Sequence, residues 1–253
     1  MKPKKDQIRE LLKAIETGDA KAVAAVNEAK YIQHNPHTHE GSEGLAALFK
    51  RLSLTNPRVN IVRAFEDGDF VFAHTEYDFS SRKIGFEVFR FEDGQAVEHW
   101  DNIQSRKEPT PSGHTMVDGP TQALDLSLTE TNRAFVRAFI GDVYIDRRLG
   151  QIPLFLDSHA FTQHNPSLPD GGAAIYDALM SKSDTEHTVR YDTLHRVLAE
   201  GSFVLSVSEG ALNGIHTSFY DLFRIAEGKI VEHWDTTETV APRHEWKNEN
   251  GKF

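Results

Sequence analysis

Cysteine is absent from this chain of 253 residues. Its absence excludes disulfide bonds, thiolate metal sites and cysteine nucleophiles. Basic residues are also outnumbered, because 28 Lys and Arg face 38 Asp and Glu, which gives a formal net charge of −10. Nucleic acids and anionic membrane surfaces bind basic faces, so this charge balance argues against both as partners.

Long apolar runs and several familiar motifs are missing too. No stretch approaches the roughly 18 apolar residues of a membrane span. The charged start, Met1–Asp6, lacks the apolar centre of a secretory signal, so we expect a cytoplasmic protein. Neither phosphate-binding glycine motif occurs, nor does the Gly-x-Ser-x-Gly elbow. We therefore expect no nucleotide and no other cofactor.

What the chain does contain is an internal repeat. The tetrapeptide Gln-His-Asn-Pro stands at Gln33–Pro36 and again at Gln163–Pro166. Glu-His-Trp-Asp stands at Glu98–Asp101 and again at Glu232–Asp235. Solenoid repeats are about 20–50 residues long, and this one is longer, so each copy is expected to be a whole domain.

Each copy begins with helical periodicity and continues with strand periodicity. Apolar residues at spacings of three and four from Ile8 to Ile15 predict a first helix, and residues 41–52 and 171–181 predict a later helix in each copy. Alternating patterns separated by Gly-containing turns follow in both copies, which indicates antiparallel hairpins. Helices followed by a meander of strands are typical of an α+β domain.

The domain boundaries follow from the repeat. The segment between the copies carries Pro, Gly and Asp and has no periodicity, which indicates a linker. We expect a first domain at 1–106, a linker at 107–128 and a second domain at 129–253.

The order of these elements resembles a known family, once in each copy. Helices come first, then Tyr/Phe-x-Gln-His-Asn-Pro, a Gly-Asp-Phe-Val hairpin, and finally Glu-Gly-Lys-Ile-Val-Glu-His-Trp-Asp. The pattern resembles the SnoaL-like, polyketide cyclase-like branch of the nuclear transport factor 2-like superfamily. The resemblance implies two tandem cone-shaped α+β barrel domains, each with helices packed on a curved antiparallel sheet around a deep pocket. Relatives commonly dimerise through the sheet, so the tandem would form an intramolecular pseudo-dimer.

The last hairpin of the second copy carries the first candidate carboxylate. Side chains alternate along a strand, so Asp221 shares a face with apolar Phe223. Desolvation raises the pKa of a carboxyl group and suits it to proton transfer near neutral pH. The alternative is a buried carboxylate that bonds a helix N–H group or an arginine. Glu87, beside Phe89, is its counterpart in the first copy.

The partner of Asp221 on the return strand depends on the turn. A two-residue turn at Glu227–Gly228 would pair Asp221 with Trp234, whereas a three-residue loop with a bulge would pair it with His233, beside Asp235. The sequence leaves both registers open.

In the polyketide cyclases that the chain resembles, the catalytic acid/base is an aspartate on this hairpin. The resemblance therefore implies a catalytic role for Asp235 and its counterpart Asp101. The alternative is that the His-Trp-Asp segments pack a sheet interface, with Trp100 and Trp234 buried between the copies.

Three histidines are further candidates. His34 and His164 precede Asn-Pro, which favours an extended or turn conformation. A neutral imidazole there could polarise a carbonyl group or relay a proton, and the alternative is that it only satisfies the loop backbone. His74 shares a strand face with Phe70 and Phe72 by alternation, but its counterpart is a valine, so the two pockets need not be equivalent.

A metal site is not expected. The chain has 13 histidines, and His34, His37 and His39 lie close together. However, no His-Glu-x-x-His motif occurs, and His37 and His39 have no counterpart in the second copy.

The leading hypothesis is a cofactor-independent enzyme that abstracts a proton next to a carbonyl group of a small apolar ligand, as in an aldol cyclisation or an isomerisation. The base would be Asp235 or Asp221, or in the first copy Asp101 or Glu87. The expected pocket walls are Phe89, Phe223, Trp100, Trp234, His99 and His233. One alternative is a binding or scaffold module without turnover. Another is epoxide hydrolysis, which would need an Asp–Arg–Asp network, whereas Arg224 is expected on the face opposite Asp221.

Overall fold

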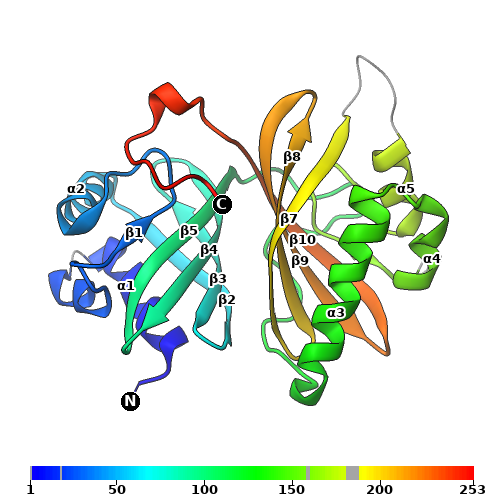
Figure 1. Cartoon of the computed structure of the whole chain (residues 1–253), viewed down its shortest axis with the longest axis horizontal. Helices are drawn as coiled ribbons and strands as arrows, with labels where there is room; N and C mark the ends of the chain where they lie inside the picture. Colours follow the sequence, from blue (N-terminus) through cyan, green and yellow to red (C-terminus); the bar gives the residue numbers. More distant parts are fainter. Residues whose placement is uncertain (1, 18, 158–159, 181–187) are drawn as a thin grey trace. The chain divides into compact units, whose positions relative to one another are not determined.

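The computed structural model describes residues 2–17, 19–157, 160–180 and 188–253, and it divides into two compact units (Figure 1). The first unit comprises Met1–Arg106 together with Val240–Phe253, and the second comprises Lys107–Thr239. Each unit is an α+β domain. The expected boundaries are corrected at both ends, because residues 107–128 pack with the second copy and residues 240–253 pack with the first.

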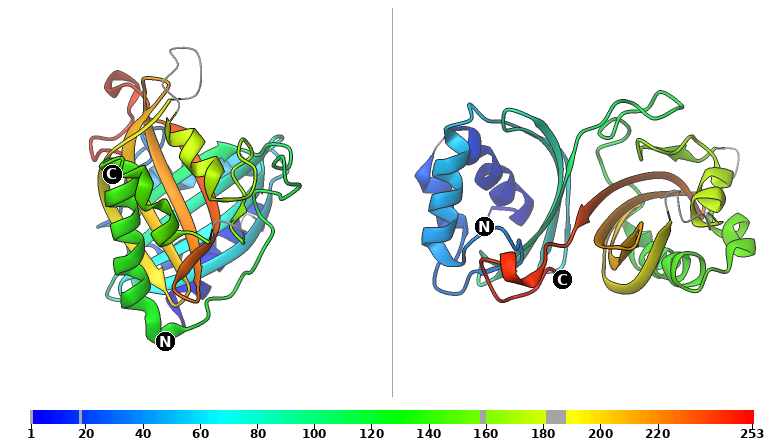
Figure 2. Two further views of the ribbon diagram at one scale, coloured as in Figure 1. Left: turned by 90° about the vertical axis from the view of Figure 1, so that its right-hand side faces the viewer. Right: turned by 90° about the horizontal axis from the view of Figure 1, so that it is seen from above.

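The first unit is a curved five-stranded sheet with helices on its concave side (Figure 2). The strand order is β1-β5-β4-β3-β2, and only the β1–β5 pair is parallel. Its elements are α1 (Lys4–Thr17), η1 (Ala20–Ala25), β1 (Ile32–Gln33), α2 (Gly41–Ser53), β2 (Arg58–Asp67), β3 (Phe70–Asp78), β4 (Arg82–Glu92), β5 (Gln95–Ser105) and, in the C-terminal segment, η5 (Arg243–Glu245).

The core of the first unit lies between α1 and the concave face. The predicted helical stripe is buried, with Ile8 at 0% exposed and Leu11 at 2%. It packs on Val71 and Phe89, which alternate along their strands with residues of the opposite face. Burying each such side chain contributes about 1.5–3 kcal/mol, so this one stripe anchors the helix to the sheet.

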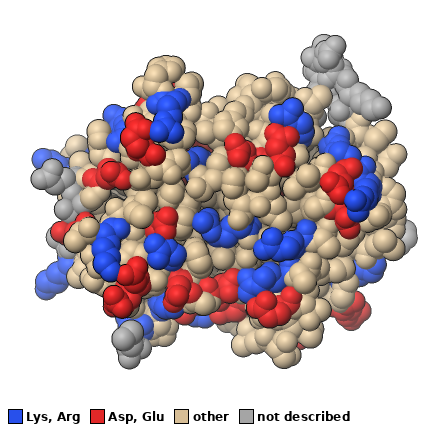
Figure 3. All heavy atoms as spheres, viewed as in Figure 1, with Lys and Arg blue, Asp and Glu red and all other residues tan. Residues whose placement is uncertain are grey.

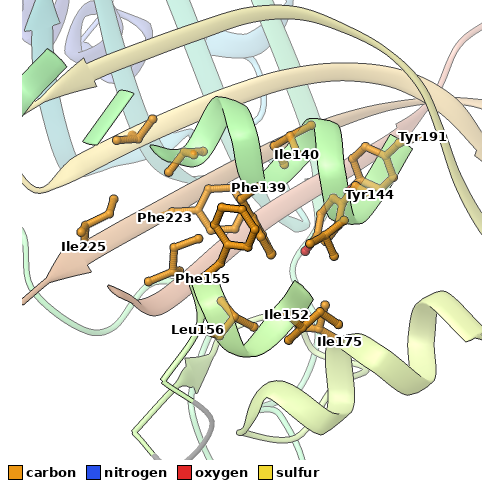
Figure 4. Close-up of a cluster of buried hydrophobic side chains, with 14 of the residues drawn as sticks. Phe139, Ile140, Tyr144, Ile152, Phe155, Leu156, Ile175, Tyr191, Phe223 and Ile225 are labelled. Carbon is orange, nitrogen blue, oxygen red and sulfur yellow. The ribbon is translucent and has the colours of Figure 1, made fainter. Parts of the chain in front are cut away.

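The second unit repeats the plan with the order β6-β10-β9-β8-β7. Its helix α5 lies within the range predicted from sequence, of which residue 181 is outside the described part. Its elements are η2 (Leu126–Leu128), α3 (Thr129–Phe139), η3 (Ile140–Ile145), η4 (Leu149–Gln151), α4 (Ile152–Phe155), β6 (Thr162–Gln163), α5 (Gly172–Met180), β7 (Val189–Glu200), β8 (Phe203–Leu212), β9 (Ile215–Ala226) and β10 (Lys229–Thr239). Figure 4 shows its core, where the ring of Phe139 meets Phe223 edge to face at a centroid distance of 5.6 Å.

The last hairpin of each unit has a two-residue turn followed by a bulge. Both central residues have positive φ, 50° at Glu227 and 73° at Gly228, which is typical of a type I′ turn. The register then shifts between Ile230 and Glu232, so that one extra residue lies on the return strand. Asp221 consequently faces Asp235, which is neither of the two registers that the sequence left open.

Charge on the surface is mixed. On the face seen in Figure 3, Lys and Arg side chains are interspersed with Asp and Glu. No helix in the described ranges is long and apolar enough to cross a membrane.

Candidate functional site

Two buried carboxylates face each other on the last hairpin of each unit. Glu87 pairs with Asp101 across β4 and β5, and Asp221 pairs with Asp235 across β9 and β10. Residues directly opposite in an antiparallel pair share one face of the sheet. Phe223, two residues from Asp221, belongs to the core of the second unit, so that pair faces the concave side. The alternation predicted from sequence therefore places these carboxylates on the core face.

A histidine bridges the inner carboxylate of the second unit to a buried amide. His233 Nε2 lies 3.0 Å from Asp221 Oδ1, and His233 Nδ1 lies 3.0 Å from Gln163 Oε1. The same Gln163 oxygen accepts the backbone N–H of Asn165 at 2.8 Å, which fixes the amide as an acceptor. His233 Nδ1 must therefore carry a hydrogen. The contact between Nε2 and Asp221 then holds one further proton, on either the ring or the carboxyl group.

The first unit repeats this arrangement with a longer carboxylate. His99 Nε2 lies 2.8 Å from Glu87 Oε2, and His99 Nδ1 lies 3.2 Å from Gln33 Oε1. Asn35 again donates its backbone N–H to that Gln33 oxygen at 2.8 Å. The inner dyad is thus common to both copies, and the extra methylene of Glu87 is accommodated without loss of the contact.

A buried tyrosine donates to each inner carboxylate, but from different strands. Tyr77 on β3 donates to Glu87 Oε1 at 2.8 Å, and Tyr191 on β7 donates to both oxygens of Asp221 at 3.1 Å. Tyr191 is paired with Gly210, the residue that occupies the position of Tyr77. The two copies therefore supply the donating phenol from neighbouring strands, and in both copies it donates to the inner carboxylate.

Space for the two phenols is made in different ways. In the first unit a Cβ atom at Gly85 would lie 2.7 Å from the ring of Tyr77, so only glycine leaves room there. In the second unit Phe219 stands at the corresponding position and stacks on Tyr191 with centroids 4.3 Å apart. The unit whose tyrosine lies on β3 therefore has a glycine at this position of the next strand, and the unit whose tyrosine lies on β7 has a phenylalanine there.

The outer carboxylate of the second unit is incompletely bonded. Asn165 Nδ2 donates to Asp235 Oδ2 at 2.6 Å. Asp235 Oδ1 is buried and has no hydrogen-bond partner within the described ranges. Burial raises the pKa of Asp235 to about 6, and the negative charge of Asp221 adds to this, while His233, Asn165 and the backbone N–H of Asp235 itself act in the opposite direction.

The outer carboxylate of the first unit has a cation beside it. Asn35 Nδ2 donates to Asp101 Oδ2 at 2.6 Å, as in the other copy. In addition, Lys252 Nζ donates to the Asp101 backbone oxygen at 2.8 Å and lies 3.4 Å from Oδ1. Burial by itself would raise the pKa of Asp101, but the charges of Lys252 and His99 and the Asn35 hydrogen bond outweigh burial and lower it.

The C-terminal segment holds this lysine in place. Asn248 Nδ2 donates to the backbone oxygens of Asn35 at 2.8 Å and Thr38 at 3.0 Å. The Gly251 backbone oxygen lies 2.9 Å from the ring of His34. Figure 1 shows the segment, in red, lying beside β1. Lys252 is only 2% exposed, so its ammonium group is a fixed part of the first unit.

The Gln-His-Asn-Pro histidines lie away from the carboxylate pairs. His34 Nε2 lies 2.8 Å from Glu98, and the His34 ring stacks on Trp100 at 4.6 Å. Glu98 and Trp100 alternate with His99 and Asp101, so they belong to the opposite face of β5. The second unit has the same contacts among His164, Glu232 and Trp234. The expectations that both histidines border the pocket and that both tryptophans line it are corrected by this face assignment.

His74 is also on the opposite face. Val71 and Ala73 of β3 belong to the core, so His74 and Phe72 point the other way. The ring of His74 packs on Phe86 at 4.6 Å, and its Nδ1 lies 2.6 Å from Arg63. His74 therefore lies on the face of the sheet opposite to Glu87, which pairs with Ala73.

Several residues of the site were missed in the sequence. Gln163 and Asn165 recur in both copies, and that repetition was the available signal for their role beside the carboxylates. Tyr77 shares the two-residue period of Val71 and could have been found in that way. Lys252 gave no signal, because it belongs to a terminal segment that was assigned to the other copy.

Three donor atoms of the first unit lie close enough to hold a metal ion. Glu87, His99 and Asp101 place one donor atom each within 4.8 Å of one another. These donors already have partners, since His99 bonds Glu87 and Lys252 lies beside Asp101. The lysine supplies the positive charge that a metal ion would bring.

A charged groove of ≈ 320 Å³ lies elsewhere in the first unit, and its lining includes Lys13, Glu16, Arg58 and Tyr77. Its lining includes none of the four paired carboxylates, and it meets the carboxylate site only at Tyr77, the donor to Glu87.

Each unit is thus an α+β domain with a curved sheet, and a pair of acidic groups lies on the concave face of that sheet. Residues 8–99 match the model of the SnoaL-like domain. This match covers most of the first unit, and the second unit repeats the strand order of the first.

Several solved structures are similar to part of this chain. TsrD from Streptomyces laurentii is 21% identical over 40% of this chain and 87% of its own, with a TM-score of 0.35. IdmH from Streptomyces antibioticus, a proposed polyketide cyclase, is 18% identical over 41% of this chain and 93% of its own, with a TM-score of 0.36. A proposed ketosteroid isomerase from Kribbella flavida is 15% identical over 46% and 83%, with a TM-score of 0.38. No curated protein matches the chain.

Proposed function

We propose that the second unit is an acid–base site in which Asp235 transfers a proton at a carbon next to a carbonyl group. The observation that supports this most directly is the state of the Asp235 carboxyl group, which is buried, has a pKa raised to about 6 and has no partner for Oδ1. A carboxyl group with this pKa is about nine-tenths ionised at pH 7, and it can both accept and return a proton.

The step balances without a cofactor. Asp235 Oδ1 takes the proton from the carbon, the C–H electron pair forms the C=C bond of an enolate, and the carbonyl oxygen takes the negative charge. The carboxyl group can then return the proton to a different carbon, which gives an isomerisation. In an aldol reaction the enolate carbon instead attacks a second carbonyl group, and the alkoxide that forms takes the proton from Asp235.

Tyr144 is the proposed donor to the enolate oxygen. Burial, followed by the charges of Asp221 and Asp235, raises its pKa well above the usual value, so the phenol stays neutral and keeps its hydrogen. Its ring lies against Tyr191 with centroids 4.7 Å apart, at one end of the core cluster (Figure 4). A neutral donor in a dry site stabilises a developing oxyanion more than it would in water.

Asp221 has a different role in this proposal. It accepts from Tyr191 and bonds His233, so its oxygens are already engaged. We assign it as a positioning residue that holds His233 and raises the pKa of Asp235 through its charge. The epoxide hydrolase alternative loses support, because Arg224 bonds Glu232 at 2.6 Å, on the face away from Asp221.

The first unit is proposed to be catalytically silent. Lys252 lowers the pKa of Asp101 and keeps that carboxylate ionised, which makes it a poor base near neutral pH. The non-catalytic alternative therefore applies to this copy, in which Lys252 of the C-terminal segment lies beside Asp101.

The test compares Asp235→Asn with the matched variant Asp101→Asn. Exchange of the α-protons of benzylacetone into deuterium oxide, followed by proton NMR, reports proton abstraction directly. We expect Asp235→Asn to slow the enzyme-dependent exchange by about 10²–10⁴-fold, while Asp101→Asn leaves it close to wild type. An unchanged rate in Asp235→Asn would contradict the proposal, and loss in Asp101→Asn alone would reverse the roles of the copies.

A further inference from the structure

Two serine hydroxyls of the second unit are buried without a partner. Ser206 and Ser208 are both 0% exposed, and neither Oγ atom has a hydrogen-bond partner within the described residues. Ser206 pairs with Asp221 and Ser208 with Phe219, so both side chains lie on the concave face. A buried hydroxyl without a hydrogen bond destabilises a fold, so its presence calls for a physical reason.

The first unit has no such hydroxyls at these positions. Ala73 faces Glu87, as Ser206 faces Asp221. Thr75 faces Gly85, as Ser208 faces Phe219, but Thr75 Oγ1 donates to the Gly85 backbone oxygen at 3.0 Å. The sheet therefore folds with an alanine and a satisfied threonine there, which shows that packing alone does not require two unpaired serines.

Two further buried polar atoms of the second unit also lack partners within the described ranges, Asp235 Oδ1 and Gln163 Nε2. Asp235, Asp221 and Ser206 form a row across β10, β9 and β8. Neighbouring strands lie about 4.8 Å apart, so the ends of this row are separated by about 10 Å. The unpaired groups thus stand on both sides of the engaged Asp221.

We propose that Ser206 and Ser208 bind an oxygen atom of the substrate, remote from the carbon at which Asp235 acts. This inference rests on the proposed function and deepens it. The ligand class is a carbonyl compound with a second oxygen, either a carbonyl or a hydroxyl group, about two strand spacings from its acidic C–H group. A serine hydroxyl both donates and accepts, so either type of oxygen fits. The expected small apolar ligand is thereby replaced by an oxygenated one.

The test uses two ketones that differ by one oxygen, benzylacetone and its para-hydroxy derivative. Binding to the full chain is measured by NMR titration. We expect wild type to bind the hydroxylated ketone about tenfold more tightly, the value of roughly one hydrogen bond. In the double variant Ser206→Ala and Ser208→Ala this preference should vanish, while the affinity for benzylacetone is kept. The control is Ser218→Ala, on the opposite face of β9, which should keep the preference.

Other outcomes overturn the inference. A wild type that binds both ketones equally, or a double variant that keeps the preference, would do so. If the double variant keeps the preference and also has a lower denaturation midpoint, the serines serve only the fold, through buried water. That result would also overturn the inference. Asp235→Asn separates the two proposals, since it should slow the exchange of both ketones by about 10²–10⁴-fold and yet keep the preference in binding. If exchange survives in Asp235→Asn while the serine effect holds, the proposed function fails and the oxygen site remains.

Discussion

The two units hold the same inner dyad and differ at the outer carboxylate. Asp101 and Asp235 occupy equivalent positions and accept the same asparagine donor at 2.6 Å. Their pKa values nevertheless move in opposite directions, down for Asp101 and up to about 6 for Asp235. Residue type and the shared asparagine donor therefore do not determine these pKa values, which also depend on the Lys252 charge beside Asp101 and on the Asp221 charge beside Asp235.

The positive charge beside Asp101 is that of Lys252, which belongs to the segment that follows the second copy in the sequence. The Gly251 backbone oxygen bonds His34 at 2.9 Å, and the Thr115 backbone oxygen bonds His164 at 2.7 Å. The next residue is Lys252 in one segment and Met116 in the other, and both are 2% exposed. A tandem chain can change one of these residues without the other, which a symmetric homodimer cannot do, so duplication permits the two equivalent carboxylates to have different pKa values.

The largest effect is expected when the lysine is removed. Lys252→Met leaves Asp101 buried without its cation, and breaking a buried ion pair from one side costs about 3–5 kcal/mol. We expect the free energy of unfolding of the first unit, measured by denaturant titration at pH 7, to fall by about that amount.

The control is the double variant Lys252→Met with Asp101→Asn, which removes both charges and should recover most of the loss. Equal unfolding curves for wild type and Lys252→Met would show that Lys252 does not stabilise the buried carboxylate.

The second effect is a difference in the pH dependence of stability. The pKa of folded Asp235 is about 6, above an unfolded value of about 3.9, so its contribution to stability is fully present below pH 4 or so and is lost as the pH rises through about 6. The loss is about 3 kcal/mol for the second unit. Asp235→Asn should remove this slope from the curve of unfolding free energy against pH.

Asp101 gives the matched comparison with the opposite sign. Its folded pKa is lowered, so its stabilisation is present above the unfolded value and is lost as the pH falls through the folded one. Asp101→Asn should therefore flatten the acidic part of the curve and leave the region between about 4 and 6 unchanged. The same change in slope for both variants would remove the electrostatic distinction between the copies.

The sequence predicted the faces of the carboxylate strands but not their register. Phe223 beside Asp221 provided a clear alternation, and the structure places both on the core face. The bulge that brings Asp221 opposite Asp235 is an irregularity of the backbone at Val231, and the side-chain pattern of the sequence does not predict it.

The face of β3 could not be predicted from alternation because both sides of the strand are buried. Phe72 and Ala73 are each 0% exposed, so alternation correctly grouped His74 with Phe72 but could not show that their face is the one away from the helices. Lys252 was equally hidden, because lysine is almost always exposed and its sequence position gives no hint of burial. A buried residue of a type that is usually exposed, such as Lys252, can be identified only from the folded structure.

The smallest expected effect concerns a feature that the two copies share, the tyrosine that donates to the inner carboxylate. Tyr77 and Tyr191 each donate to an inner carboxylate from a different strand. If both phenols serve only to satisfy that carboxylate, Tyr77→Phe and Tyr191→Phe should each lower the free energy of unfolding of their own unit by about 1.5–3 kcal/mol, the range for a hydrogen bond to a charged group. Denaturant titration of the two variants gives the two values. Similar losses would show that the strand supplying the donor is unimportant, whereas a clearly smaller loss for Tyr191→Phe would mean that His233 alone satisfies Asp221 and that the dyads differ after all.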